Sequence, residues 1–353
     1  MEKELYKVSV VIPIYKVELF VARCVQSLME QTLTDVEFIF VDDASPDSSI
    51  SVLRKVIAKY PERSNRVKVL THTENKGLPA ARNTGLAVAQ GEYIFHCDSD
   101  DFVDSDMLEQ LYRKATETDA DIVWCDWWLS FARNERYMKQ PEYLTPMEAL
   151  KGMLSGVMKF NVWNKLIRRS LYVENDIKFP AGYGMGEDMT IMRLFARASK
   201  VAYLPKAFYH YVQLNTGAFS KTYSNRHLEE LQHNVSLLLR DLQQLFGDQL
   251  KKEMAFFQLD VKFPFLITDD FSKYKLWQSW YPEANQYILQ NRQLSWRSRG
   301  LQWLAWKHQF WTIWLYYKCI HKIIYGCKKR SRLLQQKRRC CYSSDVAKLM
   351  FSS

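Results

Sequence analysis

The segment Asp98-Ser99-Asp100-Asp101 places three carboxylates within four positions of the chain. The residues before it, 92–97, are mostly apolar or β-prone, which predicts a buried strand that ends where the acidic residues begin. Carboxylates this close together repel one another unless a cation or a ligand with many donors lies among them. Such a site suits a hard divalent ion, Mg²⁺ or Mn²⁺, which also binds phosphate oxygens. The alternative is a solvated loop before a helix, where aspartate is common.

A second acidic pair occurs further along the chain, in Gly184-Met185-Gly186-Glu187-Asp188-Met189. The glycines allow a hinged loop that delivers two carboxylates to the start of a helix. A carboxylate in such a place can act as a general base if it lies within about 2.6–3.2 Å of the hydroxyl that it deprotonates. The alternative is that Glu187 and Asp188 only cap the helix, because acidic residues in a first turn favour the helix dipole.

Further polar residues follow the first two predicted strands. Pro13 and Tyr15 lie at the end of the first strand, where the tyrosine ring can lean over a ligand. Asp43 ends the second strand and could accept hydrogen bonds from a base or a ribose. Arg82, in the helix that follows residues 75–77, can form charge-assisted hydrogen bonds with a phosphate. Arg82 could equally hold the acidic strand ends together as a structural ion pair.

Strands and helices alternate along the first part of the chain and position these residues. Apolar runs predict strands at 8–14, 36–41, 67–70, 92–97 and 122–127. Helical spacing predicts helices at 20–29, 48–59, 79–89 and 105–118. This alternation indicates an α/β fold, in which a mostly parallel sheet is covered by helices on both faces. Because ligands bind at the carboxyl ends of such strands, Asp42-Asp43 and the Asp98 segment are expected to share one crevice.

The rest of the chain is predicted to be mainly helical. Helices are expected near 189–198, at 227–246 and at 249–290, the last with breaks at Pro264 and Pro282. We therefore divide the chain into an α/β domain at 1–222, which carries the candidate site residues, a helical region at 223–295 and a basic, aromatic tail at 296–353.

The excess of positive over negative charge lies in this tail. Residues from Trp296 onward carry 13 Lys and Arg against one acidic residue, whereas the whole chain has 49 Lys and Arg against 39 Asp and Glu. A basic tail can bind nucleic acid or anionic lipid. The nearly neutral body offers no matching basic surface, so no nucleic-acid partner is expected. No signal peptide is expected at residues 1–4, and the lack of a C-x-x-C pair favours reduced thiols in a cytoplasmic protein.

The tail also carries an aromatic and apolar stripe. Its members recur at steps of three and four residues and are Trp303, Trp306, Phe310, Ile313, Tyr317, Ile320 and Ile324. Only nine residues separate His308 from Lys318, whereas a membrane-spanning helix needs about 20 apolar residues. The stripe, flanked by Lys307, Lys318 and Lys322, predicts a helix that lies in the interface above anionic lipids. The alternative is a helix packed in the core.

Several segments within roughly the first 105 residues resemble the nucleotide-sugar domain of the family-two glycosyltransferases, which have the GT-A fold. Both the order and the spacing of the segments match. They are Val10-Val11-Ile12-Pro13-Ile14-Tyr15, Gln31-Thr32, Val41-Asp42-Asp43-Ala44-Ser45, Asn75-Lys76-Gly77-Leu78, Ala81-Arg82-Asn83-Thr84-Gly85-Leu86, Gly91-Glu92-Tyr93-Ile94 and Asp98-Ser99-Asp100-Asp101. One departure is Lys16, where the family usually has Asn after the tyrosine.

The resemblance implies a nucleotide-diphosphate sugar donor, usually UDP-linked, and a divalent metal ion, Mn²⁺ or Mg²⁺. The positions that match the donor site are Pro13, Tyr15, Glu18, Asp43, Arg82, Asp98 and Asp100. Of these, Pro13, Tyr15 and Asp43 would hold the base and the ribose. Asp98 would contact the ribose or the sugar, and Asp100 would bind the metal that bridges the two phosphates.

The resemblance also implies the reaction. Asp188 matches the acid that activates the acceptor in related enzymes, with Glu187 in support, so we expect inverting transfer of a hexosyl or N-acetylhexosaminyl group to an acceptor hydroxyl. Given the basic tail, the expected acceptor is a glycan or a polyprenyl-linked oligosaccharide at the inner face of the cell membrane, in bacterial surface polysaccharide synthesis. The alternative is a non-catalytic, membrane-associated protein that binds nucleotide sugars.

Four more residues have less specific expectations. Trp163 could stack on the face of a sugar, Lys165 could meet a phosphate, and His210 could supply a third metal ligand. Packing or surface charge explains Trp163 and Lys165 as readily, and a histidine among aromatic residues is more often a core residue than a metal ligand. Asp101 is expected only to start the next helix.

Overall fold

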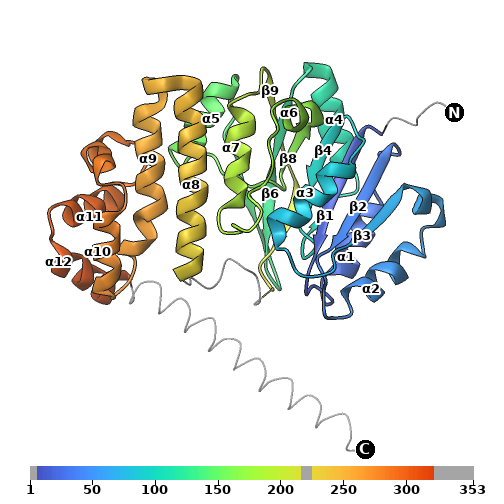
Figure 1. The fold of residues 1–353 in the computed structure, drawn as a ribbon, viewed down its shortest axis with the longest axis horizontal. Coiled ribbons are helices and arrows are strands. Elements are labelled where there is room, and N and C mark those ends of the chain that lie inside the picture. The colour runs from blue at the N-terminus through green and yellow to red at the C-terminus, as the bar shows by residue number, and fades with distance from the viewer. Residues whose placement is uncertain (1–5, 216–224, 322–353) are drawn as a thin grey trace, which may run out of the picture. The chain divides into compact units, whose positions relative to one another are not determined.

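The computed structural model describes residues 6–215 and 225–321 of the chain (Figure 1). The chain divides into two compact units, of which the first ends at Lys251 and the second begins at Lys252. The first unit contains the sheet and every candidate residue upstream of the tail. The second unit is helical.

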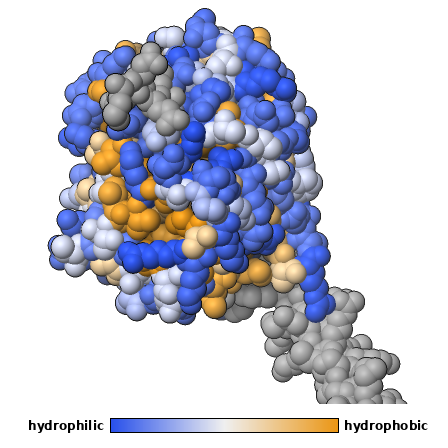
Figure 2. Space-filling view, turned by 90° about the vertical axis from the view of Figure 1, so that its right-hand side faces the viewer, coloured by the Kyte–Doolittle hydropathy of each residue, from blue (hydrophilic) through white to orange (hydrophobic). Residues whose placement is uncertain are grey.

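Four parallel strands form the first half of the sheet. They are β1 (Val8–Ile14), β2 (Val36–Asp42), β3 (Val67–Thr71) and β4 (Tyr93–His96), in the spatial order β3-β2-β1-β4 (Figure 1). Every residue of β1 and β2 is buried, as their mostly apolar sequences predict for strands covered on both faces. β3 is the edge strand and is only half-buried. Figure 2 shows hydrophobic surface among polar residues on this side of the unit.

The second half of the sheet is mixed. It is built from β8 (Lys165–Arg168), β6 (Ile122–Ser130), β9 (Val201–Val212), β5 (Phe102–Val103) and, paired to β6, β7 (Glu135–Met138). β6 and β9 are parallel, whereas β8, β5 and β7 run antiparallel to their neighbours. The predicted α/β fold is confirmed, and the parallel arrangement holds for β1–β4 and for β6 with β9.

Helices cover both faces of the sheet. On one face α1 (Val21–Met29), α2 (Ser49–Ile57) and α4 (Met107–Thr118) share one apolar cluster with alternate residues of β1, among them Val10 and Ile12. On the other face α3 (Leu78–Val88) lies against Val11, and a Cβ at Gly85 of this helix would overlap the Val11 side chain. Gly85 therefore brings α3, and Arg82 with it, close to the sheet.

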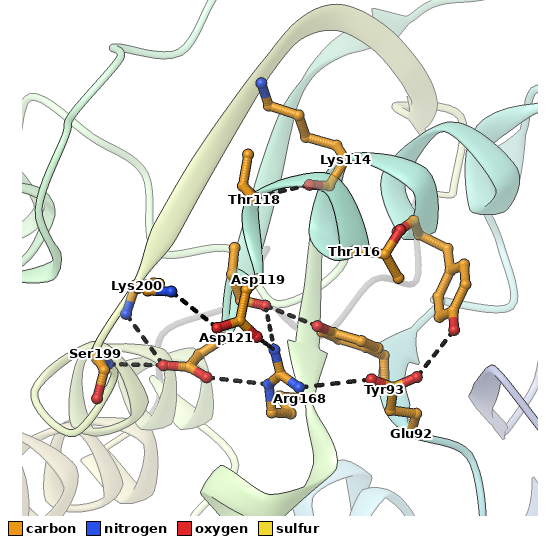
Figure 3. Close-up of polar contacts among 12 residues, drawn as sticks. Glu92, Tyr93, Lys114, Thr116, Thr118, Asp119, Asp121, Arg168, Ser199 and Lys200 are labelled. Atoms are coloured by element: carbon orange, nitrogen blue, oxygen red, sulfur yellow. Dashed lines mark hydrogen bonds and ion pairs between the residues drawn. The ribbon is translucent and has the colours of Figure 1, made fainter.

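An ion-pair network lies at the end of the sheet where β4 begins (Figure 3). Arg168, the last residue of β8, contacts Asp121 at 3.1 Å, Asp119 at 3.0 Å and Glu92 at 3.5 Å. Its guanidinium also lies 5.1 Å from the centre of the Tyr93 ring. Because Tyr93 starts the strand that Asp98 follows, the network fixes the end of β4 opposite to the acidic segment.

Helices and single turns complete the first unit. They are α5 (Pro146–Leu154), α6 (Arg169–Glu174), a 3₁₀ turn (Glu187–Met189), α7 (Thr190–Phe195), α8 (Asn225–Phe246) and a 3₁₀ turn (Gly247–Leu250). The helix predicted near 189–198 is thus shorter than expected. α7 and α8 are joined by Asp241, which accepts hydrogen bonds from Arg193 at 2.8 Å and from Arg197.

The second unit packs its helices around a core of large side chains. Its elements are α9 (Lys251–Lys262), a 3₁₀ segment (Phe263–Leu266), α10 (Phe271–Ser279), a 3₁₀ segment (Pro282–Gln290), α11 (Trp296–Trp306), α12 (Phe310–Tyr316) and a π-helical turn (Tyr317–His321). Tyr274, Trp277 and Ile313 are buried. Pro264 and Pro282 lie in the first turn of the two 3₁₀ segments, so the predicted breaks are confirmed.

The single helical stripe predicted for the tail is wrong. α11 ends at Trp306 and α12 begins at Phe310, and between them His308 has a positive φ of 58°, which turns the chain. Within the stripe Ile313 is buried, whereas Trp303 is 38% and Trp306 is 36% exposed, so its residues split between core and surface. The expected lysine flank also changes, because Lys318 pairs with Asp269 at 2.6 Å.

The remainder of that stripe is only partly covered by the structure. The Ile320 side chain, Lys322 and Ile324 lie outside the described residues. Within the part of the chain that is described, no helix combines the length and the apolar character needed to cross a bilayer.

Candidate active site

Arg82 lies at the centre of the candidate site. It is carried by α3 and is 1% exposed. Its Nη2 donates to Oδ1 of Asp98, which lies two residues beyond the end of β4, at 2.8 Å. Its Nε donates to Glu187 Oε1 at 3.3 Å. Burial alone would lower the pKa of Arg82, but the carboxylates of Glu187, Asp98 and Asp188 raise it above its ordinary value. The arginine thus joins two acidic segments that are far apart in the sequence.

Asp188 belongs to this charge cluster. It lies in the 3₁₀ turn beside the buried Glu187 and is itself only partly buried. Burial and the Glu187 carboxylate raise the pKa of Asp188 well above its ordinary value, and Arg82 opposes this shift. A raised pKa brings a carboxylate closer to the pH at which it can work as a general base.

Helix α8 holds the loop that carries these two acids. Glu230 Oε2 accepts a hydrogen bond from the Met185 backbone N–H at 3.0 Å. Asn234 Nδ2 donates to the backbone carbonyls of Tyr183 and Met185 at 2.9 Å each. Glu230 and Asn234 are buried and four residues apart, so they face the loop from one side of the helix. Neither residue was predicted from the sequence, although polar residues on the buried face of an amphipathic helix were a signal for them.

Asp100 and Asp101 have different surroundings. Asp100 is partly exposed, and its Oδ2 accepts from Asn215 Nδ2 at 2.9 Å. Asp101 is buried, and it accepts from the Tyr209 hydroxyl at 2.7 Å and the Val212 backbone N–H at 2.7 Å. The expectation that Asp101 starts a helix is wrong. Its carboxylate accepts hydrogen bonds from β9, and the residues that follow it form β5.

A divalent ion fits this acidic segment only with help from a substrate. Among the described residues, no group of three or more His, Cys, Asp and Glu side chains could hold an ion by itself. Mg²⁺ and similar ions are commonly bound by one or two carboxylates together with substrate phosphates. Asp100, partly exposed at a strand end, has the oxygen chemistry for such a shared site.

Asp43 is already engaged within the protein. Its carboxylate accepts from the backbone N–H groups of Lys76 and Gly77 at 2.8 Å each, and His72 Nδ1 lies 2.7 Å from its Oδ1. Gly77 has a positive φ of 86° and precedes α3. Asp43 therefore orders the turn from which the Arg82 helix starts.

A cavity of about 390 Å³ opens beside the end of β1. Its lining residues are Lys16, Glu18, Leu19, Phe20, Pro46, Asp47, Leu214 and Asn215. Glu18 Oε2 accepts from the Ser48 backbone N–H at 3.0 Å. Pro13 is buried within β1, and Tyr15 is exposed with the Lys16 ammonium 5.1 Å from its ring centre. The cavity meets Asp100 through Asn215, which contacts both.

Trp163 and Lys165 are built into the protein interior. Trp163 is buried and stacks on Tyr209 with 4.4 Å between ring centres. Lys165 Nζ donates to the backbone carbonyls of Lys159 and Asn161 and to the Asn164 side chain, at 2.7–3.1 Å. Burial lowers the pKa of Lys165 to about 7. These surroundings favour the packing explanation for both residues over contacts with a sugar or a phosphate.

His210 also has a packing explanation. Its ring stacks on Phe102 with 4.1 Å between centres, and its Nε2 and Nδ1 lie 3.0 Å from Asp104 and 2.8 Å from Glu135. The carboxylate contacts raise the pKa of His210 against the effect of burial. With both ring nitrogens engaged, His210 links β9 to its neighbours.

Comparison with known proteins assigns this arrangement to a family. A sequence profile described as "Glycosyl transferase family 2" matches residues 9–184. The "Cholesterol galactosyltransferase" of Borreliella burgdorferi is 32% identical over 257 residues, which cover 69% of this chain and 70% of that protein. "Glycosyltransferase GlyG" of Streptococcus pneumoniae is 32% identical over 229 residues, which cover 61% of this chain and 73% of that protein.

Solved structures share the fold at lower identity. The crystal structure of S. aureus TarS 1–349 in complex with UDP has a TM-score of 0.66 at 20% identity, over 88% of this chain and 91% of that chain. The mannosyltransferase PcManGT from Pyrobaculum calidifontis, in complex with GDP-Man and Mn²⁺, has a TM-score of 0.50 at 15% identity, over 89% and 88% of the two chains. The predicted GT-A architecture with a helical C-terminal region is confirmed, and the chain is a glycosyltransferase that belongs to family 2.

Proposed function

We propose that this glycosyltransferase moves a sugar from a nucleotide-diphosphate sugar, UDP-linked, to a hydroxyl of a glycan or lipid-linked acceptor, with inversion at the anomeric carbon. The observation that supports this most directly is the position of Arg82 between Asp98 and Glu187. Asp98 stands on the donor side of the site and Glu187 is the neighbour of Asp188. The buried Arg82 thus connects the proposed donor-binding Asp98 with the segment that carries the proposed base, Asp188.

The donor site is proposed at the ends of β1, β2 and β4. Its residues are Pro13, Tyr15, Glu18, Asp43, Arg82, Asp98 and Asp100. The exposed Tyr15 and the cavity lined by Glu18 offer room for a nucleotide, and a related fold is known in complex with UDP. Asp43 orders the turn before α3, and its second oxygen, which accepts one hydrogen bond from Gly77, retains a lone pair for a base.

Asp100 is the proposed ligand of Mn²⁺ or Mg²⁺, together with the diphosphate of the donor. A divalent ion held by Asp100 would offset negative charge on the diphosphate oxygens. A structure of related fold holds Mn²⁺ with a nucleotide sugar, which supports the assignment. Asn215, which donates to Asp100 Oδ2, orients the carboxylate for this role.

Asp188 is the proposed general base. It removes the proton of the acceptor hydroxyl while the hydroxyl oxygen attacks the anomeric carbon from the face opposite the nucleotide. A bond forms between that oxygen and the anomeric carbon, and the bond from this carbon to the phosphate oxygen breaks. The nucleoside diphosphate leaves with the bonding electrons, and the proton stays on Asp188. Glu187 and Arg82 hold the base in place.

The second unit is proposed to bind a membrane surface beside a polyprenyl-linked acceptor, in synthesis of bacterial surface polysaccharide. Trp296 is 81% exposed and Trp311 is 72% exposed, both on helices of this unit. Exposed tryptophans favour the interface between water and lipid, and the basic residues from Trp296 onward favour anionic headgroups.

A panel of nucleotide sugars tests the proposed donor class. The purified chain is incubated with each nucleotide sugar and Mn²⁺, and release of the nucleoside diphosphate is measured. Metal-dependent release from UDP-sugars is expected. Release from another nucleotide class alone would contradict the UDP assignment.

A further inference from the structure

Tyr183 presents an aromatic ring on the loop that carries Asp188. The residue is 39% exposed although one face of its ring is covered by His233 of α8. The two rings are stacked with 3.6 Å between their centres and 5° between their planes. A large side chain is thus held at the surface five residues before the proposed base.

The backbone beneath this ring is fixed as well. Asn234 donates to the Tyr183 carbonyl at 2.9 Å, and the Tyr183 backbone N–H donates to the Pro180 carbonyl at 3.0 Å. Asp241 binds α8 to α7 through Arg193. Because backbone, ring and supporting helix are all held, Tyr183 loses little conformational entropy when it binds a ligand.

We propose that the Tyr183 ring, supported by His233, is a stacking platform for a pyranose ring of the acceptor glycan. A pyranose has a face of C–H groups with a slight positive charge, and an aromatic ring has a negative face that attracts them. This inference rests on the proposed function, since it takes Asp188 as the base that an acceptor hydroxyl must reach.

The position of the loop favours the acceptor over the donor. Arg82 meets Asp98 with Nη2 and Glu187 with Nε, so the loop and the donor-side carboxylate contact neighbouring nitrogens of one guanidinium. An acceptor whose hydroxyl meets Asp188 passes the same loop. Tyr183 is the exposed large aromatic residue of that loop and can contact the rest of the sugar.

Glycan binding by the full chain tests the platform. Wild type, Tyr183→Ala and Tyr183→Phe are applied, with UDP and Mn²⁺, to a printed array of pyranose-containing oligosaccharides. Tyr183→Ala is expected to weaken glycan binding on the order of tenfold, as loss of one aromatic stacking contact implies. Tyr183→Phe keeps the ring and is expected to bind like wild type. Leu144→Ala, which truncates an 82% exposed residue before α5, is the matched control.

UDP affinity and thermal unfolding are measured on the same proteins and are expected to stay unchanged in all three variants. The proposal is overturned if Tyr183→Ala binds glycans as wild type does, if it loses UDP binding in parallel, or if wild type binds UDP but no pyranose glycan. Failure of the proposed base is a separate result, because an Asp188→Asn enzyme that still turns over contradicts the mechanism without changing glycan binding to Tyr183.

Discussion

Arg82 donates from Nη2 to Asp98 at 2.8 Å from a position that is almost completely buried. The same guanidinium reaches Glu187 with its Nε. The two carboxylates belong to segments that meet only in the folded protein, one after β4 and one before α7. The Arg82 side chain therefore links the proposed donor and base halves of the site directly.

Replacing Arg82 with methionine is expected to destabilise the fold. The change leaves Asp98 and Glu187 close together without a cation, and breaking a buried pair costs about 3–5 kcal/mol. The lower end applies here because the Asp98 carboxylate is a quarter exposed and partly solvated. Unfolding by urea measures the difference. Arg54→Met changes an exposed arginine of α2 and should stay within about 0.5 kcal/mol of wild type; equal stability of both variants would contradict the pairing.

Removal of the metal is expected to weaken donor binding. With EDTA, the affinity of wild type for UDP should fall, because the metal ion that carboxylate and phosphates share is removed, and it should return when Mn²⁺ is added in excess. Asp100→Ala should show the weak binding in both conditions. Asp106→Ala, which removes a surface partner of Lys206, should behave as wild type. Calorimetric titration with UDP measures all three, and affinity that ignores EDTA would contradict the metal site.

The transfer rate is expected to fall with decreasing pH. Asp188 must be ionised to accept a proton, and its pKa is raised above its ordinary value by burial and by Glu187. The rate should therefore decline at a higher pH than an ordinary aspartate, with its pKa of about 3.9, would cause. The measurement is kcat/KM for donor hydrolysis from pH 4.5 upward, with circular dichroism to confirm folding. A rate that stays flat down to the lowest pH would exclude Asp188 as the titrating base.

Membrane binding is expected to depend on the exposed tryptophans of the second unit. Trp296→Ser and Trp311→Ser should each lower the fraction that floats with vesicles of anionic lipid, by about tenfold in partition coefficient, because each removes a large apolar surface. Leu144→Ser, in the first unit, controls for loss of an exposed apolar side chain. High salt should weaken binding of every variant. Flotation of the tryptophan variants at the wild-type level would argue that these residues do not touch lipid.

The local sequence pattern was sufficient for the first strands. The nearly continuous apolar run from Val8 to Ile14 predicts a buried strand, and β1 has these bounds. The end of β4 before Asp98 was predicted within one residue, because polar residues stop an apolar run abruptly. The bounds of these strands are determined by residues close in sequence, and a periodic pattern of apolar residues reports on such local neighbours.

Contacts between distant segments could not be predicted in the same way. Asp101 bonds to Tyr209 and Val212, more than one hundred positions away, and a two-residue strand that no pattern indicates separates it from α4. The turn at His308 was missed because apolar residues keep their three- and four-residue steps through it. Periodicity reports which residues are apolar, and it does not report a backbone turn that leaves the spacing unchanged.

The role of Asp188 is tested most directly by the Asp188→Asn enzyme. Its stability at pH 7 should not fall, because a carboxyl whose pKa is raised on folding costs stability when it is ionised, and the amide removes that cost. UDP affinity, measured by calorimetry with Mn²⁺, should match wild type. Release of UDP from the sugar donor selected in the panel should fall about 10²–10⁴-fold, the usual contribution of a general base. A variant that binds UDP and turns over at the wild-type rate would contradict the assignment of Asp188 as the base.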